Sequence, residues 1–106
     1  MSHKPNRTVR LLSIAAQDLQ DLLLYIAAED PAAALALADK IEAEMAKLAA
    51  YPYLGKIPQD THLAQLSYRV LVVEDYLLFY KIKGQTILVY RILHGARDVP
   101  RLLEDA

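Results

Sequence analysis

The sequence predicts an α+β fold in which a helical hairpin packs on a four-stranded, mainly antiparallel sheet. The first observation is that residues 67–98 form three apolar runs separated by two short polar breaks, at Glu74-Asp75 and at Lys83-Gly84-Gln85. Runs of about seven residues with short connectors are typical of an antiparallel meander. The second observation is that two stretches with helical spacing precede these runs, so helices and strands are segregated along the chain. The predicted order is β-α-α-β-β-β, followed by a short helix.

Length and composition predict one globular domain over residues 1–106, with a flexible tail at residues 1–7. The chain has 106 residues, of which 55% are hydrophobic, and this is enough for one core. It has no cysteine, which excludes disulfides and a cysteine nucleophile. The histidines lack ligand spacing, so no metal site and no cofactor are expected. The N-terminus carries no signal-peptide core and no apolar stretch could span a membrane, so we expect a cytoplasmic protein without a membrane partner.

The first strand is predicted at residues 8–14, where one face carries Val9, Leu11 and Ser13. The first helix is predicted at residues 15–29, because apolar residues recur there at i, i+3, i+4 and i+7. These residues are Leu19, Leu22, Leu23 and Ile26. A polar opposite face completes the pattern of an amphipathic helix that packs on one side only.

The second helix is predicted to begin at Asp30-Pro31, since Asp is a preferred N-cap and Pro is tolerated in the first turn. It continues to about Ala50, and its apolar face carries Leu37, Ile41, Met45 and Leu48. The short connection between the two helices favours an antiparallel hairpin. Residues 51–66 are expected to form a loop, because two prolines and a glycine interrupt the helical pattern.

The few cations of the predicted meander fall among apolar residues, because side chains alternate across a strand with a period of two. The expected faces are Arg69 with Leu71 and Val73, Lys81 with Leu77 and Phe79, and Arg91 with Ile87, Val89 and Leu93. After the meander, Asp98 is a candidate N-cap for a short helix with Leu102 and Leu103 on one side.

The formal net charge of −1 conceals an asymmetry along the chain. Residues 15–50 carry seven acidic side chains against two lysines, whereas residues 67–101 carry six cations against three acids. We therefore expect an acidic helical side and a mildly basic sheet side. A strong general nucleic-acid binder is more basic than this chain.

Four local patterns occur in order along nearly the whole chain, from about Val9 to Leu103. They are Ala16-x-Asp18-Leu19-x-x-Leu22-x-x-Tyr25-Ile26-Ala27, Tyr51-Pro52-x-x-Gly55, Tyr68-Arg69-Val70 and Tyr90-Arg91-Ile92-Leu93-His94-x-x-Arg97-Asp98. Together with the predicted order of elements, they resemble the RelE/ParE superfamily of toxins from type II toxin–antitoxin modules, and its ParE branch more closely. The resemblance implies a cytoplasmic toxin with a role in plasmid stabilisation, neutralised by an antitoxin encoded beside it.

The resemblance leaves two mechanisms open, because RelE-like members cleave mRNA in the ribosomal A site and ParE-like members bind DNA gyrase. Cleavage of RNA needs a general acid or base, for which His94 is the candidate, and cations at the phosphate, for which Arg69 and Arg91 are candidates. RelE-like nucleases also use cations or a carboxylate from the preceding loop and a tyrosine near the C-terminus. This chain offers only Lys56 in the loop and no tyrosine after Tyr90. The sequence therefore favours a gyrase inhibitor, with a ribosome-dependent mRNA endonuclease as the alternative.

The predicted partner-binding residues are Arg69, Arg91, His94, Arg97 and Arg101. For three of these positions, a role within the protein's own structure is an alternative to partner binding. His94 could bond a neighbouring carbonyl, Arg69 could pair with a carboxylate of the protein itself, and Arg97-Asp98 could combine a surface cation with a helix cap. No residue is firmly assigned as catalytic, so whether the chain is an enzyme stays open at this point.

Overall fold

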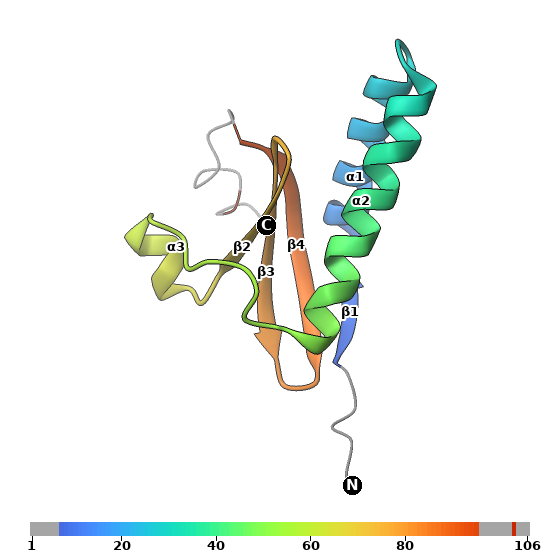
Figure 1. The fold of residues 1–106 in the computed structure, drawn as a ribbon. Coiled ribbons are helices and arrows are strands. Elements are labelled where there is room, and N and C mark those ends of the chain that lie inside the picture. Colours follow the sequence, from blue (N-terminus) through green and yellow to red (C-terminus); the bar gives the residue numbers. More distant parts are fainter. Residues whose placement is uncertain (1–6, 96–102, 104–106) are drawn as a thin grey trace, which may run out of the picture.

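A computed structural model describes residues 7–95 and residue 103 of the chain. A helical hairpin stands against one face of a four-stranded sheet, which gives the predicted α+β class (Figure 1). The elements in order are β1 (Thr8–Leu11), α1 (Ser13–Ala27), α2 (Pro31–Ala50), α3 (Thr61–Gln65), β2 (Arg69–Val73), β3 (Tyr76–Lys83) and β4 (Thr86–His94). Among the described residues, no helix is long and apolar enough to cross a membrane.

The sheet has the strand order β1-β4-β3-β2. Strands β2, β3 and β4 form the predicted antiparallel meander, with turns at residues 74–75 and 84–85. Strand β1 lies beside β4 and runs parallel to it, from Thr8 opposite Thr86 to Leu11 opposite Val89. The parallel pair is possible because the whole helical hairpin connects β1 to the rest of the sheet.

Each face of the sheet has its own core. On the hairpin side, Ile41 and Leu48 of α2 are fully buried with strand residues such as Leu78 and Ile87. The predicted apolar faces of both helices take part in this core, since Leu19, Leu22, Leu23, Ile26 and Met45 pack against it. On the opposite side a smaller core holds Leu63, Tyr68, Phe79, Leu93 and Leu103.

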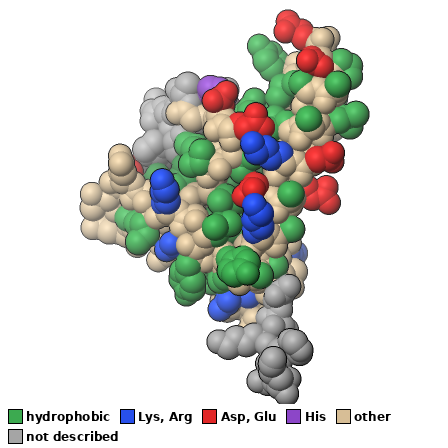
Figure 2. All heavy atoms as spheres, in the orientation of Figure 1, with side chains coloured by type: hydrophobic (Ala, Val, Ile, Leu, Met, Phe, Trp, Pro, Cys, Tyr) green, Lys and Arg blue, Asp and Glu red, His purple; other side chains and the backbone are tan. Residues whose placement is uncertain are grey.

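Charge is unevenly distributed over the surface. Figure 2 shows that acidic side chains on this face of the molecule gather over the helical hairpin, whereas the lysine and arginine side chains lie lower on the same face. Two of these cations already have acidic partners at the surface, as Lys40 lies 3.7 Å from Glu74 and Lys47 lies 2.8 Å from Glu44. Exposed pairs of this kind contribute little to stability.

The first strand is shorter than predicted, and α1 begins earlier. Strand β1 ends at Leu11, where its pairing with β4 stops, and Ser13 and Ile14 belong to the helix. The amide of Leu12 still donates to the carbonyl of Val89, and the carbonyl of Leu12 accepts the first helical bond, from Ala16. Because Leu12 offers no side-chain cap, the sequence carries no local signal for this boundary.

The segment predicted to be a loop contains the short helix α3. Asp60 caps it, since its carboxylate accepts a hydrogen bond of 2.9 Å from the amide of Leu63. A helix of five residues is too short to show a periodic apolar face, which is why the sequence pattern did not reveal it. The predicted helix after Asp98 lies outside the described residues, apart from Leu103, which is buried in the smaller core.

The prediction that Arg91 shares a strand face with Ile87, Val89 and Leu93 is wrong in part, because β4 contains a bulge. Tyr80 pairs with Val89 whereas Phe79 pairs with Arg91, so one extra residue, Tyr90, is inserted into β4. The insertion shifts the alternation of side chains by one position. Arg91 therefore leaves the face that carries Val89 and lies, with Leu93, on the face of the smaller core.

The loop after α2 is attached to the sheet by Tyr80, which is fully buried. The Tyr80 hydroxyl accepts a hydrogen bond of 2.9 Å from the amide of Gly55 and donates one of 2.7 Å to the carbonyl of Pro52. A Cβ atom on Gly55 would lie 2.7 Å from the Tyr80 ring and 2.8 Å from the carbonyl oxygen of Val70. Only glycine permits this approach, which explains the Tyr51-Pro52-x-x-Gly55 pattern.

We predict that Gly55→Ala lowers the free energy of unfolding by about 1–3 kcal/mol, because neither a buried ring nor a strand backbone can yield to the added methyl group. Urea denaturation followed by circular dichroism measures this change. Gly95→Ala is the matched control, since its Cβ would meet no heavy atom closer than 3.5 Å. Equal effects of the two substitutions would contradict the prediction.

Candidate partner-binding site

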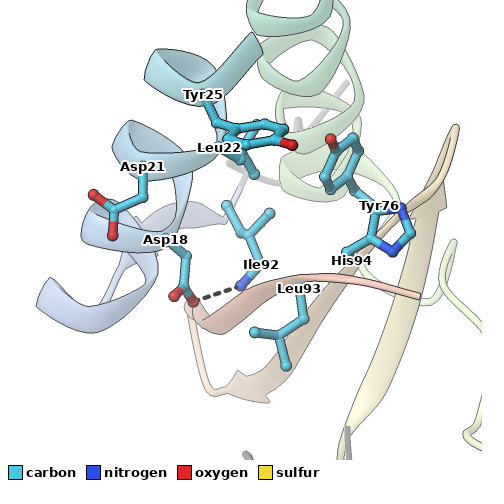
Figure 3. A pocket seen from close by; sticks show the side chains of 8 residues that line it. All are labelled: Asp18, Asp21, Leu22, Tyr25, Tyr76, Ile92, Leu93 and His94. Carbon is cyan, nitrogen blue, oxygen red and sulfur yellow. Dashed lines mark hydrogen bonds between the residues drawn. The ribbon is translucent and has the colours of Figure 1, made fainter. Parts of the chain in front are cut away.

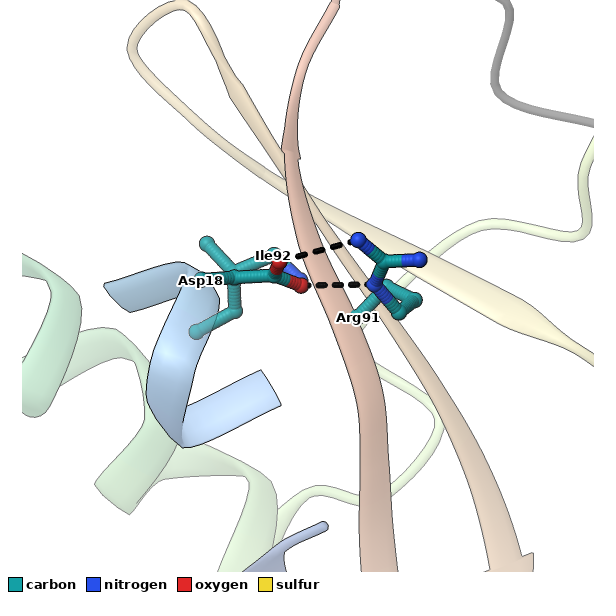
Figure 4. A network of polar contacts seen from close by, with 3 residues as sticks. All are labelled: Asp18, Arg91 and Ile92. Atoms are coloured by element: carbon teal, nitrogen blue, oxygen red, sulfur yellow. Dashed lines mark hydrogen bonds and ion pairs between the residues drawn. The ribbon is translucent and has the colours of Figure 1, made fainter. Parts of the chain in front are cut away.

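An ion pair between Asp18 and Arg91 connects α1 to β4. Arg91 Nε donates to Asp18 Oδ2 over 2.7 Å, and Arg91 Nη2 donates to Asp18 Oδ1 over 2.9 Å. The amide of Ile92 also donates to Asp18 Oδ2, over 3.1 Å (Figure 4). The two charged side chains are only 11% and 14% exposed, so the pair lies largely outside the reach of solvent.

The early end of β1 explains this geometry. Since β1 pairs with β4 only as far as Val89, the remaining part of β4 has no neighbouring strand on that side. Helix α1 begins at this point and places Asp18 beside the unpaired amide of Ile92. The carboxylate satisfies that amide and neutralises Arg91 at the same time. Arg91, one of the predicted partner-binding residues, is therefore engaged within the molecule.

A groove of about 340 Å³ lies between α1 and the last residues of β4 (Figure 3). It is lined by Asp18, Asp21, Leu22, Tyr25, Tyr76, Ile92, Leu93 and His94. His94 is exposed and its ring meets the Tyr76 ring edge to face at 5.5 Å between centroids. None of these eight described residues is a lysine or an arginine, so they present carboxylates, an imidazole and two phenols over an apolar floor.

Burial raises the pKa of the Tyr76 phenol, and electrostatic interactions with Asp75, Glu74 and Tyr25 raise it further, in that order. The hydroxyl of Tyr76 therefore stays protonated at neutral pH. In chemical terms, the groove offers hydrogen bonds and apolar contact to a partner. Its described lining offers no lysine or arginine that would hold a phosphate.

Arg69 lies at the start of β2, away from this groove. Its Nη2 atom donates to the carbonyl of Gly55 over 2.7 Å and to the carbonyl of Tyr53 over 3.2 Å. Its guanidinium carbon lies 5.2 Å from the centroid of the Tyr53 ring. Sequence reasoning offered a carboxylate of the protein as the structural alternative for Arg69, but in the described part of the chain Arg69 binds carbonyl groups.

Lys81 forms a further polar cluster, which sequence reasoning missed. Its ammonium group lies 4.4 Å from the centroid of Tyr68 and 4.9 Å from that of Tyr90, and these two rings meet edge to face. Burial lowers the pKa of Lys81, and the charge of Lys83 lowers it further. Burial also raises the pKa of Tyr68, with a smaller contribution from Tyr90. Only the register of three strands brings these residues together, so no local sequence pattern could have revealed them.

The candidate residues of the nuclease alternative occupy three different environments. His94 lines the groove, Arg91 is bound by Asp18, and Arg69 is bound to the loop after α2. The other two predicted partner-binding residues, Arg97 and Arg101, lie outside the described residues. Within residues 7–95 and 103, no group of three or more His, Cys, Asp or Glu side chains could hold a metal ion.

We predict that Asp18→Asn lowers the free energy of unfolding by about 3 kcal/mol, because it leaves the Arg91 guanidinium largely buried without its counter-charge. Asp21→Asn is the matched control on the same helix, since Asp21 makes only an exposed hydrogen bond with Gln17. We expect less than about 0.5 kcal/mol for the control in the same urea titration. A loss of stability as small for Asp18→Asn as for the control would show that the ion pair does not contribute the predicted free energy of unfolding.

Comparison with known proteins connects this geometry to a family. The family model described as the ParE toxin of the type II toxin–antitoxin system parDE matches residues 9–99. No curated protein matches the chain.

Two solved structures share the fold. A chain of the chromosomal ParDE toxin–antitoxin system from P. aeruginosa has a TM-score of 0.69 at 20% sequence identity, covering 83% of this chain and 95% of that chain. A chain of the RelBE2 toxin–antitoxin complex from Mycobacterium tuberculosis has a TM-score of 0.60 at 24% identity, covering 92% of this chain and 100% of that chain. The predicted resemblance to the RelE/ParE superfamily is confirmed. Because the family model covers most of its length, the chain belongs to the ParE toxin family of type II toxin–antitoxin systems.

Proposed function

We propose that this ParE-family toxin acts by binding DNA gyrase and that a cognate antitoxin neutralises it. The observation that carries the proposal is the ion pair of Arg91, a candidate phosphate ligand that is already neutralised by Asp18. Catalysis of RNA cleavage needs cations that are free to stabilise charge on the reacting phosphate. A phosphate that took the same two nitrogens of Arg91 would have to displace a carboxylate that accepts three hydrogen bonds.

The surroundings of His94 support the same proposal. The described residues that line the groove beside His94 include two carboxylates and no lysine or arginine, which disfavours a polyanionic substrate there. Arg69 belongs to a different pocket, and the net charge of −1 gives little attraction to a site lined by RNA. In this proposal His94, Arg69, Arg97 and Arg101 contact protein partners, and Arg91 supports the fold through its ion pair with Asp18.

The antitoxin is part of the proposal because the two similar solved structures come from toxin–antitoxin systems. The surface of this chain offers an acidic hairpin and a more basic lower part, so a partner could complement both signs (Figure 2). An antitoxin and gyrase as partners imply action in the cytoplasm.

We predict that the purified protein inhibits supercoiling by gyrase and leaves mRNA intact, and that His94→Gln changes either result little. Glutamine keeps the size and hydrogen bonding of the side chain but cannot act as a general acid or base near neutral pH. The assays are gyrase supercoiling and cleavage, run beside ribosome-dependent cutting of mRNA. His62→Gln on α3 is the matched control, as His62 is also exposed and lies outside the groove.

The opposite result would favour the endonuclease. Unaffected supercoiling, together with mRNA cutting that falls by about 10²–10⁴-fold in His94→Gln and persists in His62→Gln, would assign a catalytic proton transfer to His94. The gyrase proposal would then be wrong, and the ribosome and mRNA would be the targets.

We also predict that expression of the chain alone arrests growth, and that co-expression with the adjacent small open reading frame restores it. The product of that reading frame should co-purify with the chain, because complementary charge and apolar contact hold the two together. Failure of both rescue and co-purification at moderate salt would contradict the antitoxin part of the proposal.

A further inference from the structure

A second pocket, of about 320 Å³, lies where β2 begins, and among the described residues that line it only Arg69 is charged. Its other walls are largely apolar or aromatic and include Tyr53, Ile57, Ala64 and Ile82. Tyr53 and Ile57 are exposed to 67% and 64%, although both have large apolar surfaces. We call this the Arg69 pocket.

Only part of the hydrogen-bonding capacity of Arg69 is used within the described chain. Both bonds that it makes come from Nη2, and the buried Nε has no partner. The donors of Nη1 likewise make no bond to the described residues, and no carboxylate lies within ion-pair distance of the guanidinium there. A guanidinium with unused N–H donors at Nη1 gains from a carboxylate that accepts a charge-assisted hydrogen bond from one of them. Arg91 already has such a partner in Asp18, and Arg69 does not.

The position of Arg69 is fixed before any ligand arrives. Its two carbonyl acceptors belong to Tyr53 and Gly55, and Tyr80 attaches the same loop to the sheet from below. The Tyr53 ring covers the guanidinium at 5.2 Å, which favours the charged group further. A preorganised side chain loses little conformational entropy on binding, so an incoming acid gains most of the contact energy.

We infer that the Arg69 pocket binds a carboxylate side chain from an acidic segment of the antitoxin. This inference rests on the proposed function, since it names where that partner docks. A single cation among apolar and aromatic walls suits one acidic residue flanked by apolar ones. A nucleic acid, in contrast, is bound by several cations that follow successive phosphates. The antitoxin is favoured as the source because both similar solved structures belong to toxin–antitoxin systems.

The test measures the dissociation constant between the full chain and the protein encoded by the adjacent open reading frame, by isothermal titration calorimetry at two salt concentrations. We expect Arg69→Gln to weaken binding about 10- to 100-fold and to reduce its salt dependence. Arg10→Gln removes the same charge from an exposed position on β1 and is the matched control. The control should change affinity less than about twofold.

A second variant leaves Arg69 and its carbonyl contacts in place, because Arg69→Gln could also loosen the loop after α2. Ala64→Glu adds a carboxylate to the wall of the pocket, where it would compete with the antitoxin for Arg69. Ala64→Gln adds a side chain of the same size without the charge. We expect Ala64→Glu to weaken antitoxin binding at least fivefold more than Ala64→Gln, with both unfolding near the wild-type temperature.

The same variants distinguish the inference from the proposed function. If wild type, Arg69→Gln and Ala64→Glu bind the antitoxin equally well, the inference is wrong and the antitoxin proposal stands. If Arg69→Gln keeps antitoxin affinity but loses gyrase inhibition, or loses binding to a single-stranded RNA oligonucleotide, the pocket serves that other partner and the inference is overturned. If wild type itself does not bind the antitoxin, the proposed partner is wrong, and the inference is wrong with it.

Discussion

The hydrogen bonds of the Asp18 carboxylate are the interaction on which the packing of α1 against β4 depends. The carboxylate accepts hydrogen bonds from two nitrogens of Arg91 and from the amide of Ile92, so one side chain holds α1 against β4. Both charges are largely buried. Removing one of them would leave the other without its counter-charge and lower the free energy of unfolding by several kcal/mol. Asp18 also lines the groove that His94 lines, so the same side chain takes part in the fold and in the candidate site.

Two arginines in closely similar sequence settings have different roles in the molecule. Arg69 follows Tyr68 and precedes a valine, and Arg91 follows Tyr90 and precedes an isoleucine. Arg91 meets a helix carboxylate because β1 ends early and leaves the edge of β4 open to α1. Arg69 lies near the other edge of the sheet, where its contacts in the described chain are two loop carbonyls and the Tyr53 ring. One charge is therefore neutralised internally, and the other is available to a partner.

The loop after α2 shows how a core contact reaches the surface. Tyr80 is buried at the centre of the sheet, yet its hydroxyl fixes the backbone at Pro52 and Gly55. This anchoring holds the exposed Tyr53 ring beside Arg69 and so gives the Arg69 pocket a stable wall. The glycine that permits the approach of Tyr80 is thus required for the shape of the pocket, although it contributes no side chain to it.

The sequence by itself determined the α+β class, the apolar faces of both helices, the Asp30 cap and the two turns of the meander. These features depend on residues close together in the chain, and the Asp30 carboxylate indeed accepts from the amide of Ala33. It also determined the family, because four short patterns occur in order. The candidate residues His94, Arg69 and Arg91 were all identifiable as polar groups in apolar runs, but their partners were not.

Only the tertiary structure decided which charges remain available. Asp18 and Arg91 are 73 positions apart, and their contact requires the parallel pairing of β1 with β4. The bulge at Tyr90 reversed the expected face of Arg91, and no residue in the run marks an inserted position. The position of Lys81 between Tyr68 and Tyr90 depends on the register of three strands. Local periodicity fixes which face a residue occupies within its own element, whereas the identity of its neighbour depends on how distant elements pair.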